Sequence, residues 1–165
     1  MALLVETGEG ILDAESYVSV EEADAYFALY GNEDWAAAEE PAKEIALRTA
    51  SRDIDLLWGA TFTGTIFTTT QGLYFPRTVE GVPLNLKRAT AEMALMILGG
   101  YSATAVASDT GAIIEESKEG LGFKKSVKYA FARNSHPELE RIRLMLGGLV
   151  FVTGSNVFQM PLVRG

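Results

Sequence analysis

The stretch Gln71–Gly100, QGLYFPRTVEGVPLNLKRATAEMALMILGG, decides the fold that we expect for this chain. Phe75 precedes Pro76, and a residue before proline is pushed out of the α region, so the stretch begins in extended form. Pro83 stands just before a run with helical apolar spacing, where its missing N–H costs nothing. We expect this run, residues 84–98, to be the central helix, with three side chains packed at its base: Leu73, Tyr74 and Phe75.

A first helix is expected immediately after Ser19. Ser19 and Glu22 form a capping-box pattern, in which each side chain satisfies a backbone N–H of the other residue. Gly31 is expected to end this helix, as glycine often does. The expected apolar side consists of Ala23, Tyr26, Phe27 and Tyr30.

Two more helices and a short helical turn around residues 35–38 complete the helical prediction. One helix opens at Pro41 and runs to about Trp58, with an apolar stripe of Leu47, Ala50, Ile54 and Leu57 that Ile45 and Leu56 widen. The other helix is capped by Asn134 or Ser135 and ends at Gly147. Between them, the Thr-rich residues 60–72 are expected to form a strand-like excursion or an ordered loop.

Two β-like runs, residues 112–118 and 123–131, favour a β-hairpin. The expected fold class is therefore mainly α: a small helical bundle of about four helices with a β-hairpin insertion and an extended C-terminal tail. We expect a domain over residues 1–149, which includes the hairpin at about 112–131. Residues 150–165 form the apolar, extended tail.

The composition sets limits on the class of protein. A chain of 165 residues with 48% apolar residues predicts one folded domain. There is no cysteine, which excludes disulfides and thiolate sites and suits a reducing compartment. Neither a signal peptide nor an apolar run of membrane-spanning length is recognisable, so no membrane association is expected.

The net charge of −8 is unevenly distributed. Residues 1–60 hold 14 acidic and 3 basic residues, whereas residues 118–143 hold 7 basic and 3 acidic residues. Overall acidity disfavours non-specific nucleic-acid binding, which depends on neutralising phosphates. The basic segment is either a solvated face or a contact for an acidic partner, including another copy of the chain.

No catalytic constellation is visible, so we expect a protein that is not an enzyme and that needs no cofactor or metal. His136 is the single histidine and adjoins a helix start, where a capping or surface role is expected. Asp53 and Asp55 should point to different sides of a helix. The glycines of the hairpin loop lack the spacing of a dinucleotide or phosphate motif.

Lysines and aromatic residues alternate in the second β-like run. Lys124, Lys125 and Lys128, together with Phe123, Tyr129 and Phe131, are typical of a weak single-strand-binding surface, where cations contact the backbone and rings stack on bases. The simpler interpretation is a hairpin with one buried aromatic face and one charged face, and the acidity of the chain favours it. Arg133 extends the basic group.

Five stretches together resemble a family of tailed-phage proteins. They are residues 17–26 (YVSVEEADAY), 31–35 (GNEDW), 44–58, 71–77 (QGLYFPR) and 83–94 (PLNLKRATAEMA), with the hairpin also fitting. Members are often labelled DnaT-like single-stranded DNA-binding proteins and are similar to head–tail adaptor (connector) proteins.

The resemblance implies a structural virion protein at the head–tail interface, assembled in the host cytoplasm. It implies a ring of about twelve copies between the portal and a tail or nozzle protein, with double-stranded DNA passing through the lumen without sequence-specific binding. An acidic lumen would let that DNA slide. The alternative hypothesis is a single-stranded DNA-binding replication accessory protein.

Candidate contact residues follow from this interpretation. The portal or another partner is expected to contact the tail at Val157, Phe158, Met160, Leu162 and Val163. The basic hairpin residues Lys124, Lys125, Lys128 and Arg133 are expected to face a neighbouring subunit or DNA. Phe75, Pro76 and Arg77 form the scaffold motif, in which Arg77 is expected to tie the loop to a helix C-terminus or a carboxylate.

Overall fold

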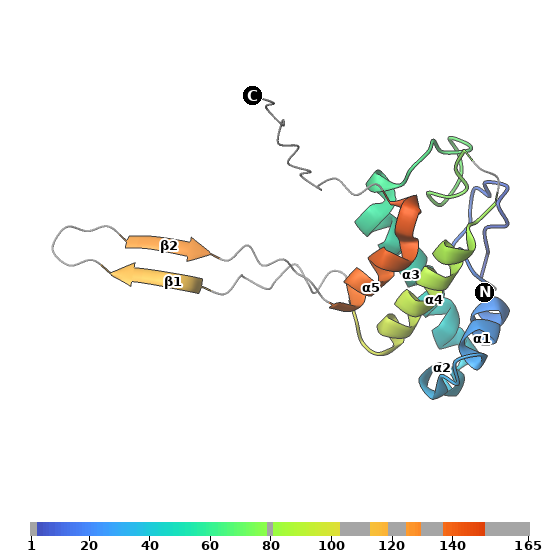
Figure 1. Ribbon diagram of the computed structural model, residues 1–165. Helices are drawn as coiled ribbons and strands as arrows, with labels where there is room; N and C mark the ends of the chain where they lie inside the picture. The colour runs from blue at the N-terminus through green and yellow to red at the C-terminus, as the bar shows by residue number, and fades with distance from the viewer. Residues whose placement is uncertain (1–2, 79–80, 103–112, 119–124, 130–136, 151–165) are drawn as a thin grey trace, which may run out of the picture.

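The computed structural model describes residues 3–78, 81–102, 113–118, 125–129 and 137–150. This part of the chain is mainly helical, as the sequence predicts (Figure 1). The principal helices are α1 (Val20–Ala28), α2 (Glu33–Ala37), α3 (Glu40–Trp58), α4 (Leu84–Leu98) and α5 (Pro137–Leu146). We refer to these helices and the loops packed on them as the helical body.

Helix α4 is central to the helical body, and its predicted bounds are confirmed. It packs against α1, α2, α3 and α5, and Pro83 provides its N-cap residue. Leu86, Ala89 and Met93 are completely buried, and the small side chains Ala91 and Ala94 let neighbouring helices approach closely. At its base Leu73 and Phe75 are buried as predicted, whereas Tyr74 is 39% exposed because its ring lies at the edge of the body.

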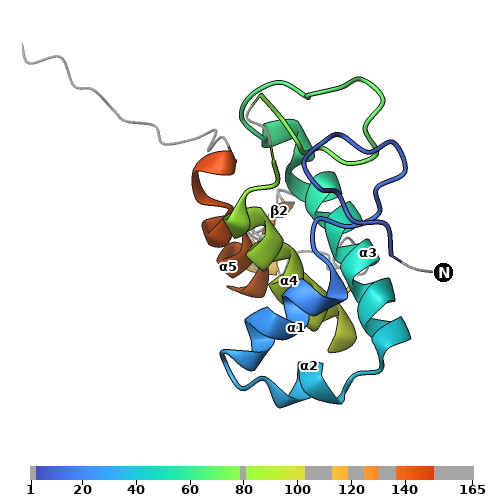
Figure 2. The same ribbon diagram turned by 90° about the vertical axis from the view of Figure 1, so that its right-hand side faces the viewer.

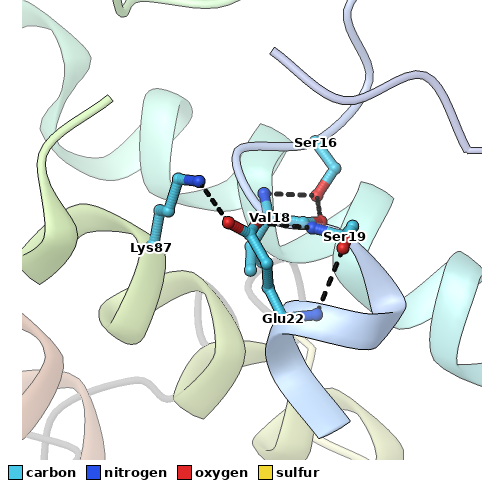
Figure 3. A network of polar contacts seen from close by, with 5 residues as sticks. All are labelled: Ser16, Val18, Ser19, Glu22 and Lys87. Carbon is cyan, nitrogen blue, oxygen red and sulfur yellow. Dashed lines mark hydrogen bonds and ion pairs between the residues drawn. The ribbon is translucent and has the colours of Figure 1, made fainter. Parts of the chain in front are cut away.

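The capping box at the start of α1 is present as predicted. Ser19 Oγ accepts from the Glu22 amide, and the Glu22 side chain accepts from the Ser19 amide (Figure 3). The helix ends at Ala28, three residues before Gly31, so Tyr30 lies in a turn and is 68% exposed. The predicted place of Tyr30 on the apolar side was therefore wrong, because the helix does not reach it.

Helix α3 buries a narrower stripe than the sequence predicts. Leu47, Ala50 and Ile54 are fully buried against α4, but Ile45, Leu56 and Leu57 are 60%, 70% and 39% exposed. The helix packs along one line of contact, and side chains beside that line face away from it. After Trp58 the chain continues as a short 3-10 turn over Gly59–Thr61.

The loop that follows residue 61 is ordered rather than a strand. Phe62 forms an isolated antiparallel bridge with Val150, and Ile66 forms another with Arg77. The Thr-rich loop thus folds back on the stretch that leads into α4, and Figure 2 shows it beside the N-terminal loop at the end of the body opposite α1 and α2.

Strands β1 (Ile113–Lys118) and β2 (Lys125–Tyr129) pair antiparallel, and Glu115 lies opposite Lys128 in the register. The residues that join them, the capping positions proposed for α5, and the tail after Val150 lie outside the described residues. The predicted hairpin insertion over 112–131 and the extended tail stay predictions in that form. Within α5, Ile142 and Leu146 are buried.

A buried carboxylate closes the N-terminal loop. Glu6 is completely buried, and its two carboxylate oxygens accept from the amides of Gly8, Gly10 and Ile11 at 2.8–2.9 Å. Gly8 and Gly10 have positive φ angles, which turn these N–H groups inward. A Cβ on Gly8 would lie 2.5 Å from the Gly81 Cα, so the loop also packs closely on the approach to α4.

We predict that Glu6→Gln destabilises the protein by about 1–3 kcal/mol, because its amide group would face an N–H donor and leave it buried without an acceptor. Urea unfolding at pH 7 measures this change. The exposed neighbour Glu9 offers a matched control, and Glu9→Gln should stay within about 0.5 kcal/mol of the wild type. Equal effects of the two substitutions would contradict the role assigned to Glu6.

Candidate functional site

The scaffold motif at residues 75–77 is held by a polar cluster that the sequence did not reveal. The Tyr17 hydroxyl donates to Asp55 Oδ1 at 2.5 Å and accepts from the amides of Tyr74 and Phe75 at 3.1 and 3.3 Å. Asp55 Oδ2 also accepts from the Tyr74 amide. We call these four residues the clasp, because they fasten the loop before α4 to α3 and to the N-terminal loop.

The elements around the clasp position each of its members. Tyr17 is completely buried, its amide donates to Ser51 Oγ, and its ring meets Phe75 edge-to-face. The Phe75–Pro76 peptide bond is cis. Because the Tyr17 hydroxyl is both donor and acceptor, this one side chain of the N-terminal loop connects α3 with the loop before α4.

Burial changes the acid–base behaviour of the clasp. It raises the pKa of the Asp55 carboxyl to about 6, although the hydrogen bonds from Tyr17 and Tyr74 and the charge of Arg77 act in the opposite direction. Burial and the neighbouring Asp55 also raise the pKa of the Tyr17 phenol, which therefore stays protonated. Asp55 thus titrates near neutral pH within a structural cluster.

Arg77 has a different role from the one expected. Its guanidinium donates to the Thr63 and Gly64 carbonyl oxygens at 2.8 and 2.6 Å, and more distantly to that of Tyr74. The two close acceptors belong to the Thr-rich loop, and all three are loop carbonyls, so the expected hydrogen bond to a helix C-terminus or a carboxylate was wrong. The planar fork of arginine suits two neighbouring carbonyls, and Arg77 fixes the loop rather than offering a free cation.

Most other cations of the helical body are also engaged within it. The ion pairs are Lys43–Asp24, Arg48–Glu15, Arg52–Asp53, Lys87–Glu22, Arg141–Glu92 and Arg143–Glu140, with N–O distances of 2.5–3.2 Å. Arg88 is exposed. Since a phosphate would have to compete with these carboxylates, the helical body is poorly suited to binding nucleic acid.

The predicted basic contact residues are only partly described. Lys125 and Lys128 lie on β2, opposite Lys118 and Glu115. Lys124 and Arg133 lie outside the described residues, as do the proposed tail contacts Val157–Val163 and His136. The structure therefore brings two members of the basic group onto one strand.

The described residues contain no group of three or more histidine or acidic side chains that could hold a metal ion. Asp53 and Asp55 make separate contacts, with Arg52 and Tyr17, as expected from their spacing. None of the helices in the described part is long and apolar enough to cross a membrane.

The features above define a mainly helical protein whose polar contacts hold its loops in place. The family model described as "putative DnaT-like ssDNA binding protein" matches residues 1–165. The chain therefore belongs to this family, whose description agrees with the DnaT-like label named in the sequence analysis. No curated protein and no solved structure matches it.

We predict that the clasp makes stability depend on pH. The folded-state pKa of Asp55 exceeds its ordinary value of 3.8. The stabilisation that the protonated carboxyl gives to the folded state is therefore fully present below about pH 4 and is lost as the pH rises through about 6. Asp55→Asn removes this titration. The unfolding free energy of the variant minus that of the wild type should therefore rise by about 2–3 kcal/mol between pH 4 and 7.5.

Urea unfolding of both proteins across this pH range provides the measurement. Asp13 is exposed, so Asp13→Asn should show a nearly constant difference from the wild type. A constant difference for Asp55→Asn as well would show that this carboxyl titrates normally.

Proposed function

We propose that this protein binds single-stranded DNA through residues 118–133, the first part of its basic segment. The match to the family over residues 1–165 supports this hypothesis more directly than the adaptor hypothesis, because the family description names single-stranded DNA. The distribution of charge supports a contact at this segment: the cations of the helical body are mostly paired, whereas residues 124–133 contain four basic residues and no acidic ones.

A paired strand that carries lysines is a reasonable platform for a flexible single strand. Lys125 and Lys128 both belong to β2, separated by Ser126 and Val127, and Tyr129 follows Lys128. Cations that follow the phosphate backbone and aromatic rings that stack on bases are the usual means of binding without sequence preference. The acidic helical body would at the same time oppose broader, non-specific adhesion.

We expect full-length protein to bind labelled oligo(dT) with an affinity that falls with salt. Neutralising three or four phosphates gives a slope of log K against log salt of roughly −2 to −3. Substituting Lys124, Lys125 and Lys128 together by alanine should abolish binding and flatten the slope. Fluorescence anisotropy at several salt concentrations measures both quantities.

A matched variant removes three charges from the helical body instead, at Arg52, Arg88 and Arg143. It should keep the salt slope of the wild type, because these side chains lie outside the proposed contact. No binding by the wild type at physiological salt would refute the hypothesis, and equal losses in both variants would place the contact elsewhere.

A second candidate, an adaptor ring between portal and tail, is favoured by one feature of the architecture. A two-stranded pair is at best marginally stable alone, and Figure 1 shows β1 and β2 to one side of the helices. A neighbouring copy could cover the pair. Exposed apolar side chains at Leu12, Ile66 and Phe67 offer a second surface for such contacts.

Under this hypothesis about twelve copies form a head-to-tail ring around double-stranded DNA, and residues 157–163 bind the portal or a tail protein. Native mass spectrometry of the free protein distinguishes the candidates. Closed rings of about a dozen copies would support the adaptor. A monomer or small oligomer that binds labelled single strands at physiological salt would exclude it.

A further inference from the structure

An apolar groove of about 280 Å³ lies between α1 and α4. Its apolar lining includes Val18, Ala25, Tyr26, Leu29, Leu84 and Ala91. Leu29 and Leu84 are 83% and 60% exposed, although they lie beside buried core residues. Large apolar side chains gathered along a groove are typical of a docking surface.

Two of the charged side chains at the rim of the groove, Lys87 and Glu22, form an ion pair with each other. Lys87 Nζ reaches Glu22 Oε1 at 2.6 Å across the gap between the two helices, and Figure 3 shows this pair beside the α1 cap. Arg88 provides the remaining charge at the rim. Such a rim suits an occupant that is apolar and nearly uncharged, rather than a strongly charged ligand.

The chain leaves the helical body next to one end of this groove. Asn85 Nδ2 donates to the Leu146 carbonyl at 3.2 Å, and the Thr63 amide donates to the Leu149 carbonyl at 2.8 Å. The first bond holds the end of α5 against the first turn of α4, which also contributes Leu84 to the groove. The second bond holds the turn after α5 against the Thr-rich loop. Leu149 lines a hollow together with Pro83, the N-cap residue of α4, so the described chain ends near this end of the groove.

The segment that starts there has a suitable composition and length. Residues 151–165, FVTGSNVFQMPLVRG, carry a single charged residue, Arg164, and are rich in apolar side chains. Phe158 is eight residues beyond Val150, a reach of up to about 26 Å in extended form. The part of α4 that lines the groove, residues 84–91, is only about 10 Å long.

We propose that residues 157–163 dock into the α1–α4 groove of their own chain. Apolar side chains of the segment cover Leu29 and Leu84, and its lack of charge avoids the cost of desolvating ions beside the rim. Attachment at Val150 gives the segment a high effective concentration at the groove, which favours its own chain over a second copy. This inference does not depend on the proposed function.

The absence of native cysteine allows a direct test in the full-length protein. Leu29→Cys combined with Phe158→Cys places one thiol at the groove and one on the segment. Leu56→Cys with Phe158→Cys is the control, because Leu56 is 70% exposed and lies on α3 only six residues before Phe62, the bridge partner of Val150. Mild oxidation followed by non-reducing electrophoresis reports the products.

We expect an intramolecular disulfide that forms at least about tenfold faster in the groove pair than in the control pair. Adding Leu84→Glu to the groove pair should slow it, because a carboxylate would then oppose apolar contact. Equal rates in both pairs would overturn the proposal. Disulfide-linked dimers as the main product would overturn it too and would assign the groove to a second copy.

Discussion

Close packing around α4 is the constraint on which the rest of the structure depends. The helix contacts four others, and small side chains at positions 89, 91 and 94 permit this close approach. Close packing leaves little room for α4 to shift relative to its neighbours. The loops that lead into α4 must therefore hold it in a fixed position. The clasp and the hydrogen bonds of the Arg77 guanidinium fix the loop that precedes this helix.

The sequence predicts what depends on local spacing. The bounds of α4 and the Ser19–Glu22 cap follow from periodicity and capping chemistry, which involve residues a few positions apart. Prediction from the sequence fails where tertiary packing determines which side chains are buried. Ile45 and Leu56 match a helical apolar stripe, yet they face away from α4. Likewise, no local signal links Tyr17 with Asp55, because their contact joins residues 38 positions apart.

The candidate sites show the same division. Charge counts locate the basic segment, and the structure adds that Lys125 and Lys128 share a strand. The partners of Arg77 could not be predicted, because carbonyl acceptors in a loop have no sequence signature. The family assignment brings a description of single-stranded DNA binding, whereas the internal pairing of cations on the helical body restricts where such binding can occur.

The bridge between Phe62 and Val150 has a mechanical consequence. Any force applied to the chain after Val150 reaches the body through this bridge and through the bonds at Thr63 and Asn85. The load therefore enters the Thr-rich loop and the first turn of α4 together, and Arg77 shares it through the Thr63 carbonyl. A pull on the C-terminal end is thus borne by the middle of the chain before it can unwind α5.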